Sequence, residues 1–154
     1  MAYGSKKIGI PPAEAVGFKS SVRYYCSGEL SVPNNTWKKV PIDTKVYDGL
    51  GEFDPTTNRF TTKESGYYLA TFKADWSVPV ADKAYTISIR KNGTNFSCRE
   101  EYLPVADVGV QLITDLIYLN AGDYLEFWAY QYSGSTATIS GGTIGTFCSI
   151  HRLS

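Results

Sequence analysis

The sequence has little of what catalysis and nucleic-acid binding usually require. It contains a single histidine, His151, and its 15 basic and 15 acidic residues leave a formal net charge of +0. Without an excess of positive charge, no overall field draws the chain to nucleic acid or to an anionic membrane. His151 is the sole candidate for a histidine base, and no G-x-S-x-G elbow or phosphate-binding glycine loop accompanies it. We therefore predict a protein that is not an enzyme and does not bind nucleic acid.

Long hydrophobic runs are also missing. No stretch approaches the roughly 20 apolar residues of a membrane-spanning helix. Near the N-terminus, Pro11, Pro12 and Glu14 interrupt the apolar run that a secretory signal would need. We expect no membrane insertion, an extended N-terminal arm over residues 1–17, and one domain over residues 18–154.

Cysteine is scarce and widely spaced, at Cys26, Cys98 and Cys148. The sequence has no C-x-x-C pair, so a zinc site is not expected. Two interpretations of the three thiols remain. One is a disulfide with a single free thiol, as in an oxidising compartment. The other, which we favour, is three buried free thiols that act as small apolar groups.

What the sequence does have is a series of short strands separated by turn residues, with 12 tyrosines and an aromatic content of 14%. No helical periodicity extends beyond one turn. Strands at this spacing are typical of an all-β sandwich. Asn92-Gly93 is the preferred pair for a tight hairpin. Turn residues at 120–123 and at 133–135 predict two further hairpins, each joining strands that pair antiparallel.

The segment 42–72 carries the clearest pattern. Asp54 and Pro55 occupy the first and second positions of a type I turn. Gly66 then begins a long strand, in which Tyr68 and Phe72 point to one face while Tyr67, Leu69 and Thr71 point to the other. The aromatic positions therefore predict the buried frame of a sandwich.

The spacing of this segment resembles the globular head of the complement C1q-like family, a relative of the tumour necrosis factor superfamily, in a bacterial or viral type. The matching positions are Asp48, Phe53, Phe60, Gly66, Tyr68 and Phe72. Ile42 and Ala70 depart from the pattern, since the family has aromatic residues there. The resemblance continues at 115–130 and 146–154. It implies a jelly-roll β-sandwich of about ten antiparallel strands, with Phe53, Phe60, Gly66, Tyr68 and Phe72 defining the core, and a threefold ring of such domains.

Two strands have large apolar side chains on both faces. In 108–119, one face has Val110, Leu112, Leu116 and Tyr118, and the other has Ile113, Ile117 and Leu119. In 124–130, aromatic residues face away from the inward Leu125, Phe127 and Ala129. Aromatic residues are enriched at interface cores, so we predict that a trimer interface includes Ile113, Ile117, Tyr124, Trp128 and Tyr130. The alternative is that the outward aromatics are exposed or covered by the N-terminal arm.

Three acidic residues cluster around the loop at 49–52, namely Asp48, Glu52 and Asp54. Closely spaced carboxylates suit Ca²⁺, and some C1q-like heads are similar in carrying calcium. The spacing is not that of an EF-hand, and Asp54 already has a use in capping its turn. We predict no cofactor and keep calcium at these residues as an alternative.

These observations favour a non-catalytic homotrimeric module that binds a protein or a glycan through loops and intersubunit grooves. The alternative is a virion structural protein, such as a phage fibre head or a capsid decoration protein, which would contact other virion proteins. Both hypotheses favour an extracellular or virion-surface location.

Overall fold

The computed structural model describes residues 19–104, 106 and 108–153, and in this part of the chain every regular element is a strand. The strands are β1 (Ser21–Tyr25), β2 (Leu30–Val32), β3 (Lys38–Lys39), β4 (Thr44–Asp48), β5 (Phe53–Asp54), β6 (Arg59–Thr61), β7 (Gly66–Ser77), β8 (Lys83–Lys91), β9 (Thr94–Leu103), β10 (Val108–Leu119), β11 (Tyr124–Tyr132), β12 (Ala137–Ser140) and β13 (Phe147–Arg152). They outnumber the ten or so predicted because two-residue segments such as β3 and β5 count separately. The arm predicted for residues 1–17 lies outside the described residues.

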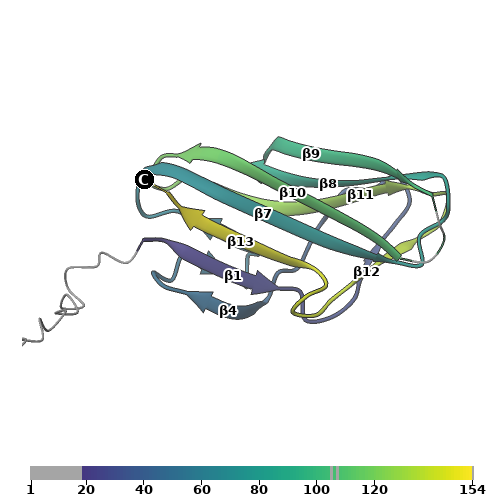
Figure 1. The fold of residues 1–154 in the computed structure, drawn as a ribbon, viewed down its shortest axis with the longest axis horizontal. Coiled ribbons are helices and arrows are strands. Elements are labelled where there is room, and N and C mark those ends of the chain that lie inside the picture. The colour runs from purple at the N-terminus through teal and green to yellow at the C-terminus, as the bar shows by residue number, and fades with distance from the viewer. Residues whose placement is uncertain (1–18, 105, 107, 154) are drawn as a thin grey trace, which may run out of the picture.

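The first layer, sheet A, has seven strands. Their order is β2-β12-β7-β13-β1-β4, and β10 pairs with the remaining edge of β7. β12 and β13 share one edge of β7 because β12 pairs with residues 75–77 and β13 with residues 68–73. β7 and β10 pair antiparallel over all 12 residues of each strand. Figure 1 shows β4, β1, β13, β7 and β10 side by side in this layer.

The second layer, sheet B, has six strands in the order β5-β6-β11-β8-β9, with β3 also paired to β11. Every strand pair in both sheets is antiparallel. The two sheets pack face to face, and the predicted all-β jelly-roll sandwich is confirmed. Two layers are needed because each sheet has one apolar face that must leave water.

Aromatic side chains from the two sheets meet in the core. The pairs and their ring-centroid distances are Tyr24–Phe53 at 4.4 Å, Phe60–Tyr68 at 5.8 Å, Phe72–Phe127 at 5.1 Å and Trp76–Tyr85 at 4.8 Å. Each pair joins one ring from sheet A and one from sheet B. Such pairs contribute about 0.5–1.5 kcal/mol beyond the area they bury. Phe53, Phe60, Tyr68 and Phe72, predicted as core residues, thus lie between the sheets, and Gly66 begins β7 in a buried position.

The alternation of β7 agrees with the sequence pattern. Tyr68 and Phe72 are fully buried, while Tyr67 is 49% and Leu69 37% exposed. Successive side chains of a strand point to opposite faces of the sheet, so each apolar residue of β7 faces either the core or the outside of sheet A. β7 therefore has an apolar inner face and two apolar side chains, Tyr67 and Leu69, on its outer face.

The structure corrects the faces assigned to β10. Ile117 is fully buried and Ile113 is only 8% exposed, because both point between the sheets. Their prediction as trimer-interface residues is wrong, since Ile117 has no exposed surface and Ile113 has only 8% left to offer a partner. The outer face of β10 instead carries Val110, Leu112 and Leu116, each 48–49% exposed. Periodicity separates the two faces of a strand but does not say which one is inside.

The hairpin predicted at Asn92-Gly93 joins β8 to β9, which pair antiparallel. Both turn residues have positive φ, 50° for Asn92 and 82° for Gly93, as a type I′ turn requires. The asparagine and glycine preference thus follows directly from the backbone that the turn needs.

The other two predicted hairpins are wrong. The turn at 120–123 joins β10 of sheet A to β11 of sheet B, and the turn at 133–135 joins β11 of sheet B to β12 of sheet A. The residues do form turns, but the strands on either side do not pair. Turn residues bend the chain equally well whether it stays in one sheet or crosses to the other. The partners of β10 and β11 are distant in sequence and are β7 and β8, respectively.

Asp123 connects two of these turns. Its carboxylate accepts hydrogen bonds from Asn92 Nδ2 at 2.8 Å and from the backbone N of Asn120 at 2.9 Å. Lys91 Nζ lies 3.1 Å from the same carboxylate. The bonds from Asn92 and Asn120, with smaller help from Lys91, lower the pKa of Asp123 to about 2. Asp123 therefore stays ionised and holds the β8–β9 and β10–β11 turns together.

Candidate functional site

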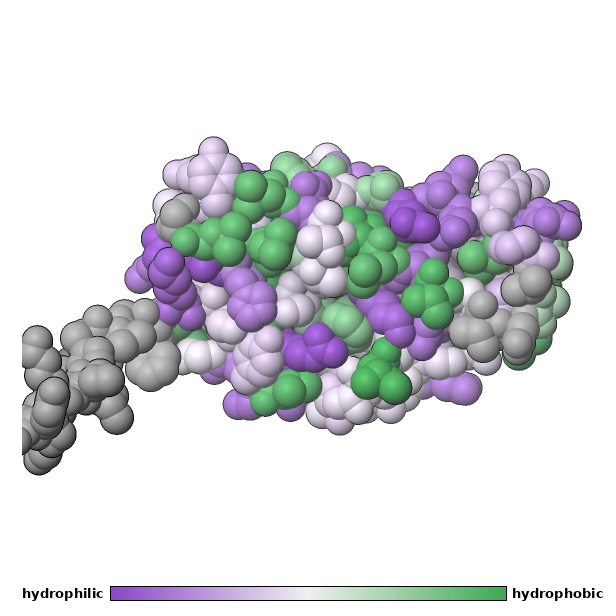
Figure 2. All heavy atoms as spheres, in the orientation of Figure 1, coloured by the Kyte–Doolittle hydropathy of each residue, from purple (hydrophilic) through white to green (hydrophobic). Residues whose placement is uncertain are grey.

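The outer side of sheet A carries an exposed apolar surface on β7 and β10. Six side chains form it, and we call it the apolar face: Tyr67, Leu69, Val110, Leu112, Leu116 and Tyr118. They are between 37% and 49% exposed. Figure 2 shows several hydrophobic groups, with polar groups between them, over β7 and β10 on this side of the molecule. Exposed apolar patches rimmed by polar residues often mark interaction sites.

Like residues face one another at one end of the apolar face, whereas Leu112 and Val110 lie opposite Lys73 and Asp75 at the other end. Tyr67 pairs with Tyr118, their rings 5.1 Å apart, and Leu69 pairs with Leu116 in the next row. These cross-strand neighbours hold one another in place and stabilise a flat surface. The apolar face is therefore set by the register of β7 and β10.

The single histidine lies at the border of the apolar face. His151 is opposite Leu69 in the β7–β13 pair. Its ring nitrogens lie 2.9 Å from Ser21 Oγ and 3.2 Å from Ser149 Oγ. Among the described residues no carboxylate bonds to this ring, so the orienting acid of a catalytic triad is missing there. The arrangement is a hydroxyl–imidazole chain on a sheet surface.

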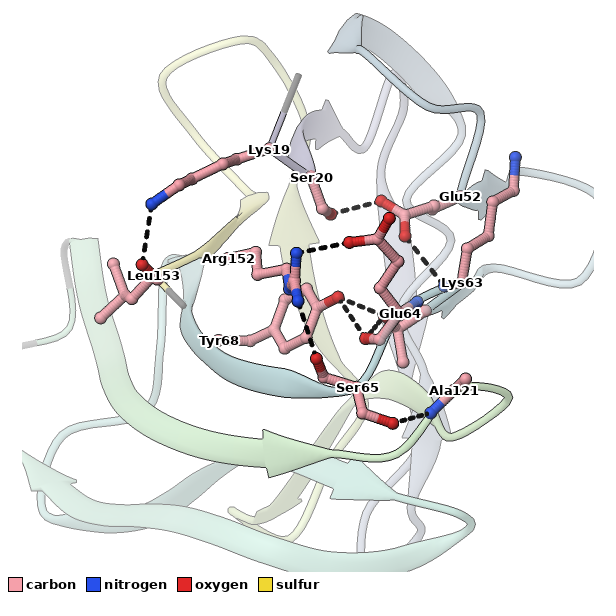
Figure 3. A network of polar contacts seen from close by, with 11 residues as sticks. Lys19, Ser20, Glu52, Lys63, Glu64, Ser65, Tyr68, Ala121, Arg152 and Leu153 are labelled. Carbon is pink, nitrogen blue, oxygen red and sulfur yellow. Dashed lines mark hydrogen bonds and ion pairs between the residues drawn. The ribbon is translucent and has the colours of Figure 1, made fainter. Parts of the chain in front are cut away.

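A polar network lies at the end of the sandwich where residues 19 and 153 meet (Figure 3). Lys19 Nζ donates to the backbone O of Leu153 at 3.0 Å. Arg152 forms an ion pair with Glu64 and donates from Nη2 to the backbone O of Ser65 at 2.9 Å. These contacts join β1, β13 and the loop before β7. Both described ends of the chain therefore emerge at the same end of the domain.

The three calcium candidates lie near this network, but each carboxylate already has donors from the chain. Asp48 accepts the backbone N–H groups of Glu52 and of the next residue, both at 3.0 Å. Glu52 is only 4% exposed and accepts from Ser20 Oγ and from the backbone N of Lys63 at 3.0 Å (Figure 3). Asp54 accepts from threonines in its own turn. No group of three His, Cys, Asp or Glu side chains suited to a metal occurs among the described residues. Calcium at these residues stays the alternative to the prediction of no cofactor.

The outer side of sheet B carries a different surface, which we call the tryptophan–arginine cluster: Trp37, Lys39, Arg59, Arg90, Glu126 and Trp128. The guanidinium carbon of Arg90 lies 4.1 Å from the ring centre of Trp128 and 4.8 Å from that of Trp37. Arg59 lies over the ring of Tyr124 at 3.8 Å. Cations over aromatic faces are attracted by the electron-rich ring, by about 0.5–2 kcal/mol each.

A buried carboxylate lies in the middle of this cluster. Glu126 is 4% exposed, and its Oε1 lies 2.6 Å from Lys39 Nζ and 2.8 Å from Arg59 Nη2. Trp128 Nε1 donates to its Oε2 at 3.2 Å. Burial alone would raise the pKa of Glu126, but these donors outweigh it and the pKa lies below its ordinary value. Glu126 therefore stays ionised and holds three neighbours in fixed positions.

The aromatic residues of β11 that were predicted at a trimer interface belong to this surface. Tyr124, Trp128 and Tyr130 point outward, as the alternation indicated, and all three are half-buried. Other groups of the same chain cover them, because Trp37 packs on Tyr130 with ring centres 5.2 Å apart and Arg90 covers Trp128. Their role at an interface stays a prediction. Sequence reasoning missed Trp37, Arg90 and Glu126, which reach this surface from three separate segments.

A hollow of about 620 Å³ opens between β9 and β10, where the edges of the two sheets meet. Its walls include Arg99 and Glu101, which form an ion pair at 3.1 Å, and the apolar Leu112 and Ile113. The hollow borders the apolar face through Leu112. Cys98, Glu100 and Thr114 also line it, but the hydrogen bonds of Glu100 and Glu101 go to Thr86 and Arg99, so neither carboxylate bonds to Cys98 or Thr114.

The three cysteines are free. Cys26 and Cys148 are buried, and burial raises the pKa of both thiols, that of Cys148 to about 12. The favoured prediction of three buried thiols is wrong for Cys98, which is exposed on β9. β9 is the edge strand of sheet B, so its side chains are less covered than those of β8.

We expect one thiol per native chain to react with a maleimide, and three after denaturation. The thiolate is the reactive form, and the buried thiols of Cys26 and Cys148 are neither accessible nor ionised near neutral pH. Mass spectrometry of the labelled protein gives the count and the position. The Cys98→Ser variant should take up no label while folded, and native labelling at Cys148 would contradict the burial seen in the structure.

No helix among the described residues is long and apolar enough to cross a membrane.

No family model and no curated protein matches the sequence. The structure resembles murine APRIL, with a TM-score of 0.67 and 14% identity over 88% of this chain and 100% of that chain. It also resembles the Eiger TNF of S. frugiperda (TM-score 0.65, 10% identity, covering 89% and 94%). The globular domain of zebrafish complement 1qA gives a TM-score of 0.65 and 13% identity, covering 89% and 98%. At such identities the likeness shows the fold alone. The chain therefore has a C1q/tumour necrosis factor-like fold, as the spacing of its aromatic residues predicted.

Proposed function

We propose that the chain is a non-catalytic binding or display module that assembles as a homotrimer through the apolar face of sheet A. The observation that carries the proposal is the apolar face itself, with six large side chains 37–49% exposed on two adjacent strands. Burying such a surface against another copy would remove it from water, which favours association. The threefold ring implied by the C1q-like resemblance is the assembly that would bury it in every copy.

The outer side of sheet B is less suited to this contact. Lys39, Arg59 and Arg90 lie there among the aromatic rings, and an interface would have to remove them from water. Removing these charges from water costs more free energy than the new contact contributes, unless each charge gains a well-placed partner. The apolar face of sheet A borders two charges, those of Lys73 and Asp75, which already form an ion pair with each other at 3.4 Å. We therefore assign assembly to sheet A and leave the outer side of sheet B open to a ligand.

The non-catalytic role is supported by the surroundings of the polar side chains. His151 bonds to two serine hydroxyls rather than to an acid, and Glu126 is held by three donors of its own chain. The hollow between β9 and β10 places an ion pair beside apolar side chains. At these sites no hydrogen bonds among the described residues link a nucleophile to a base and an orienting group.

Sedimentation equilibrium tests the assembly directly. We expect a mass of three times the 17.0 kDa chain at micromolar concentration. A monomer or a dimer across this range would overturn the proposal. The virion-component alternative would use the same trimer and rests on the sequence alone, and neighbouring genes for capsid or tail proteins would favour it.

A further inference from the structure

Arg90 is held in one orientation on the outer side of sheet B. Its side chain rises from β8 beside Trp128 of β11, and its guanidinium carbon lies over the rings of Trp128 and Trp37 at 4.1 and 4.8 Å. Its Nε donates to Asn95 Oδ1 at 2.8 Å. Two rings and one hydrogen bond therefore fix the plane of the guanidinium before any ligand arrives.

The outer edge of this guanidinium has no partner. Among the described residues no acceptor lies within hydrogen-bonding distance of either Nη, and neither nitrogen is a buried atom. Glu126 is the cross-strand neighbour of Arg90, but its oxygens are taken by Lys39, Arg59 and Trp128. The pair of Nη–H groups is thus a free fork, with the geometry that a carboxylate fills with two parallel hydrogen bonds.

The surrounding charge favours an anion. Lys39, Arg59 and Arg90 carry three positive charges around the single carboxylate of Glu126, which leaves the cluster positive. Glu100 also lies on this side of sheet B, beside Thr86. Thr86 is four residues along β8 from Arg90, which corresponds to about 13 Å in a strand, and Glu100 lies beyond Thr86 on β9. The positive charge is therefore concentrated at the Arg90 end of the surface.

The rest of the surface suits a saccharide better than a peptide. The rings of Trp37, Tyr124 and Tyr130 flank the cations. Neighbours of the same chain cover part of each ring, and the part that stays exposed offers apolar surface with polar edges, which the C–H side of a sugar ring can contact. An acidic peptide would need backbone partners, which sheets supply at their edges. β8 and β11 are both paired along two edges. We infer that the tryptophan–arginine cluster binds the carboxylate of an acidic sugar through the free fork of Arg90.

This inference names a ligand class for the proposed binding module and rests on that role. All members of the tryptophan–arginine cluster belong to one chain, so sugar binding does not require the trimer. A trimer that binds no acidic sugar would overturn the inference alone, and a monomer that binds one would overturn only the proposed assembly.

The three tryptophans allow a direct test in the unmodified protein. Trp37 and Trp128 lie in the cluster, whereas Trp76 is fully buried in the core. Titration with trigalacturonic acid at low ionic strength should shift the indole N–H signals of Trp37 and Trp128 in a ¹H–¹⁵N spectrum and leave that of Trp76 in place. The neutral galactose trisaccharide should shift none of them.

Variants then locate the contact. Arg90→Lys keeps the charge but loses the planar fork, so we expect binding to weaken by about tenfold, which is the share of one charge-assisted pair. Arg90→Gln should weaken it further. Arg99→Gln is the matched control, because it also removes one positive charge from sheet B but lies opposite Ile87, on the other side of the sheet. It should bind like the parent protein.

Several results would overturn the inference. One is that millimolar trigalacturonic acid does not shift the Trp37 and Trp128 signals, or that the neutral sugar shifts them equally. Another is that Arg99→Gln weakens binding as much as Arg90→Gln does. A third is that a hexa-aspartate peptide binds more tightly than the acidic sugar. A sulfated galactose trisaccharide tests the anion, and its preferential binding would overturn the carboxylate assignment. The wild-type titration decides the question even where an Arg90 variant does not fold.

Discussion

Replacing Leu112 and Leu116 together by aspartate should convert the trimer into monomers. Both side chains lie in the middle of the apolar face and are about half exposed in the single chain, 48% and 49%. The fold therefore tolerates the change, but every copy would bring two carboxylates into an apolar contact. Leu116 has Leu69 as its cross-strand neighbour and no cation opposite it, and a buried charge without a partner costs several kcal/mol, more than most interfaces can lose. Sedimentation should then give the 17.0 kDa chain mass.

The control for this double variant is a similar change on the other sheet. Tyr102 is 67% exposed at the end of β9, outside the apolar face, so Tyr102→Asp should leave the trimer intact. Circular dichroism of both variants should show the parent β signal. A double variant that still sediments as a trimer would show that the apolar face is not the contact.

The second large effect is expected in the core, where Phe127→Ala should lower the free energy of unfolding by about 3–5 kcal/mol. Phe127 is fully buried in β11, and its ring lies 5.1 Å from that of Phe72 in β7. The substitution leaves a cavity between the two sheets and removes a contact that joins them. For a domain of this size the corresponding fall in Tm is roughly 10 °C.

Chemical denaturation at a fixed protein concentration measures this loss, since assembly makes the apparent stability depend on concentration. Tyr132→Ala on the same strand is the matched control. Its side chain is 60% exposed, and its loss should cost about 0.5 kcal/mol or less. A loss below about 1 kcal/mol for Phe127→Ala would mean that the sheets repack around the gap.

Much of the fold was predictable because it depends on local pattern. The alternation around Tyr68 and Phe72 places one side of β7 in the core, and Asn92-Gly93 fits a turn with two positive φ angles. Each of these features needs only residues that are neighbours in the sequence. The same holds for the frame aromatics Phe53 and Phe60, whose spacing reflects a turn between two short strands.

The errors have a common cause, which is that they concern contacts between distant segments. Turn residues at 120–123 do not specify whether the next strand joins the same sheet, and here β11 pairs with β8 instead of β10. The exposure of Cys98 depends on β9 being an edge strand, and nothing in the sequence of β9 indicates that position. The Arg90 site combines a loop, β8 and β11, so its members have no sequence spacing to reveal them.

The sequence by itself determined the all-β sandwich, the two faces of its long strands and the aromatic residues that join its layers. Only the tertiary structure decided which face of β10 is inside, with Ile113 and Ile117 buried and Leu112 and Leu116 left for a partner. The physical reason is that a strand with apolar side chains on both faces can turn either face to the core at similar cost. β10 pairs with β7 in one register, and sheet A packs on sheet B. Together these contacts decide which face of β10 is buried and which face is left as a binding surface.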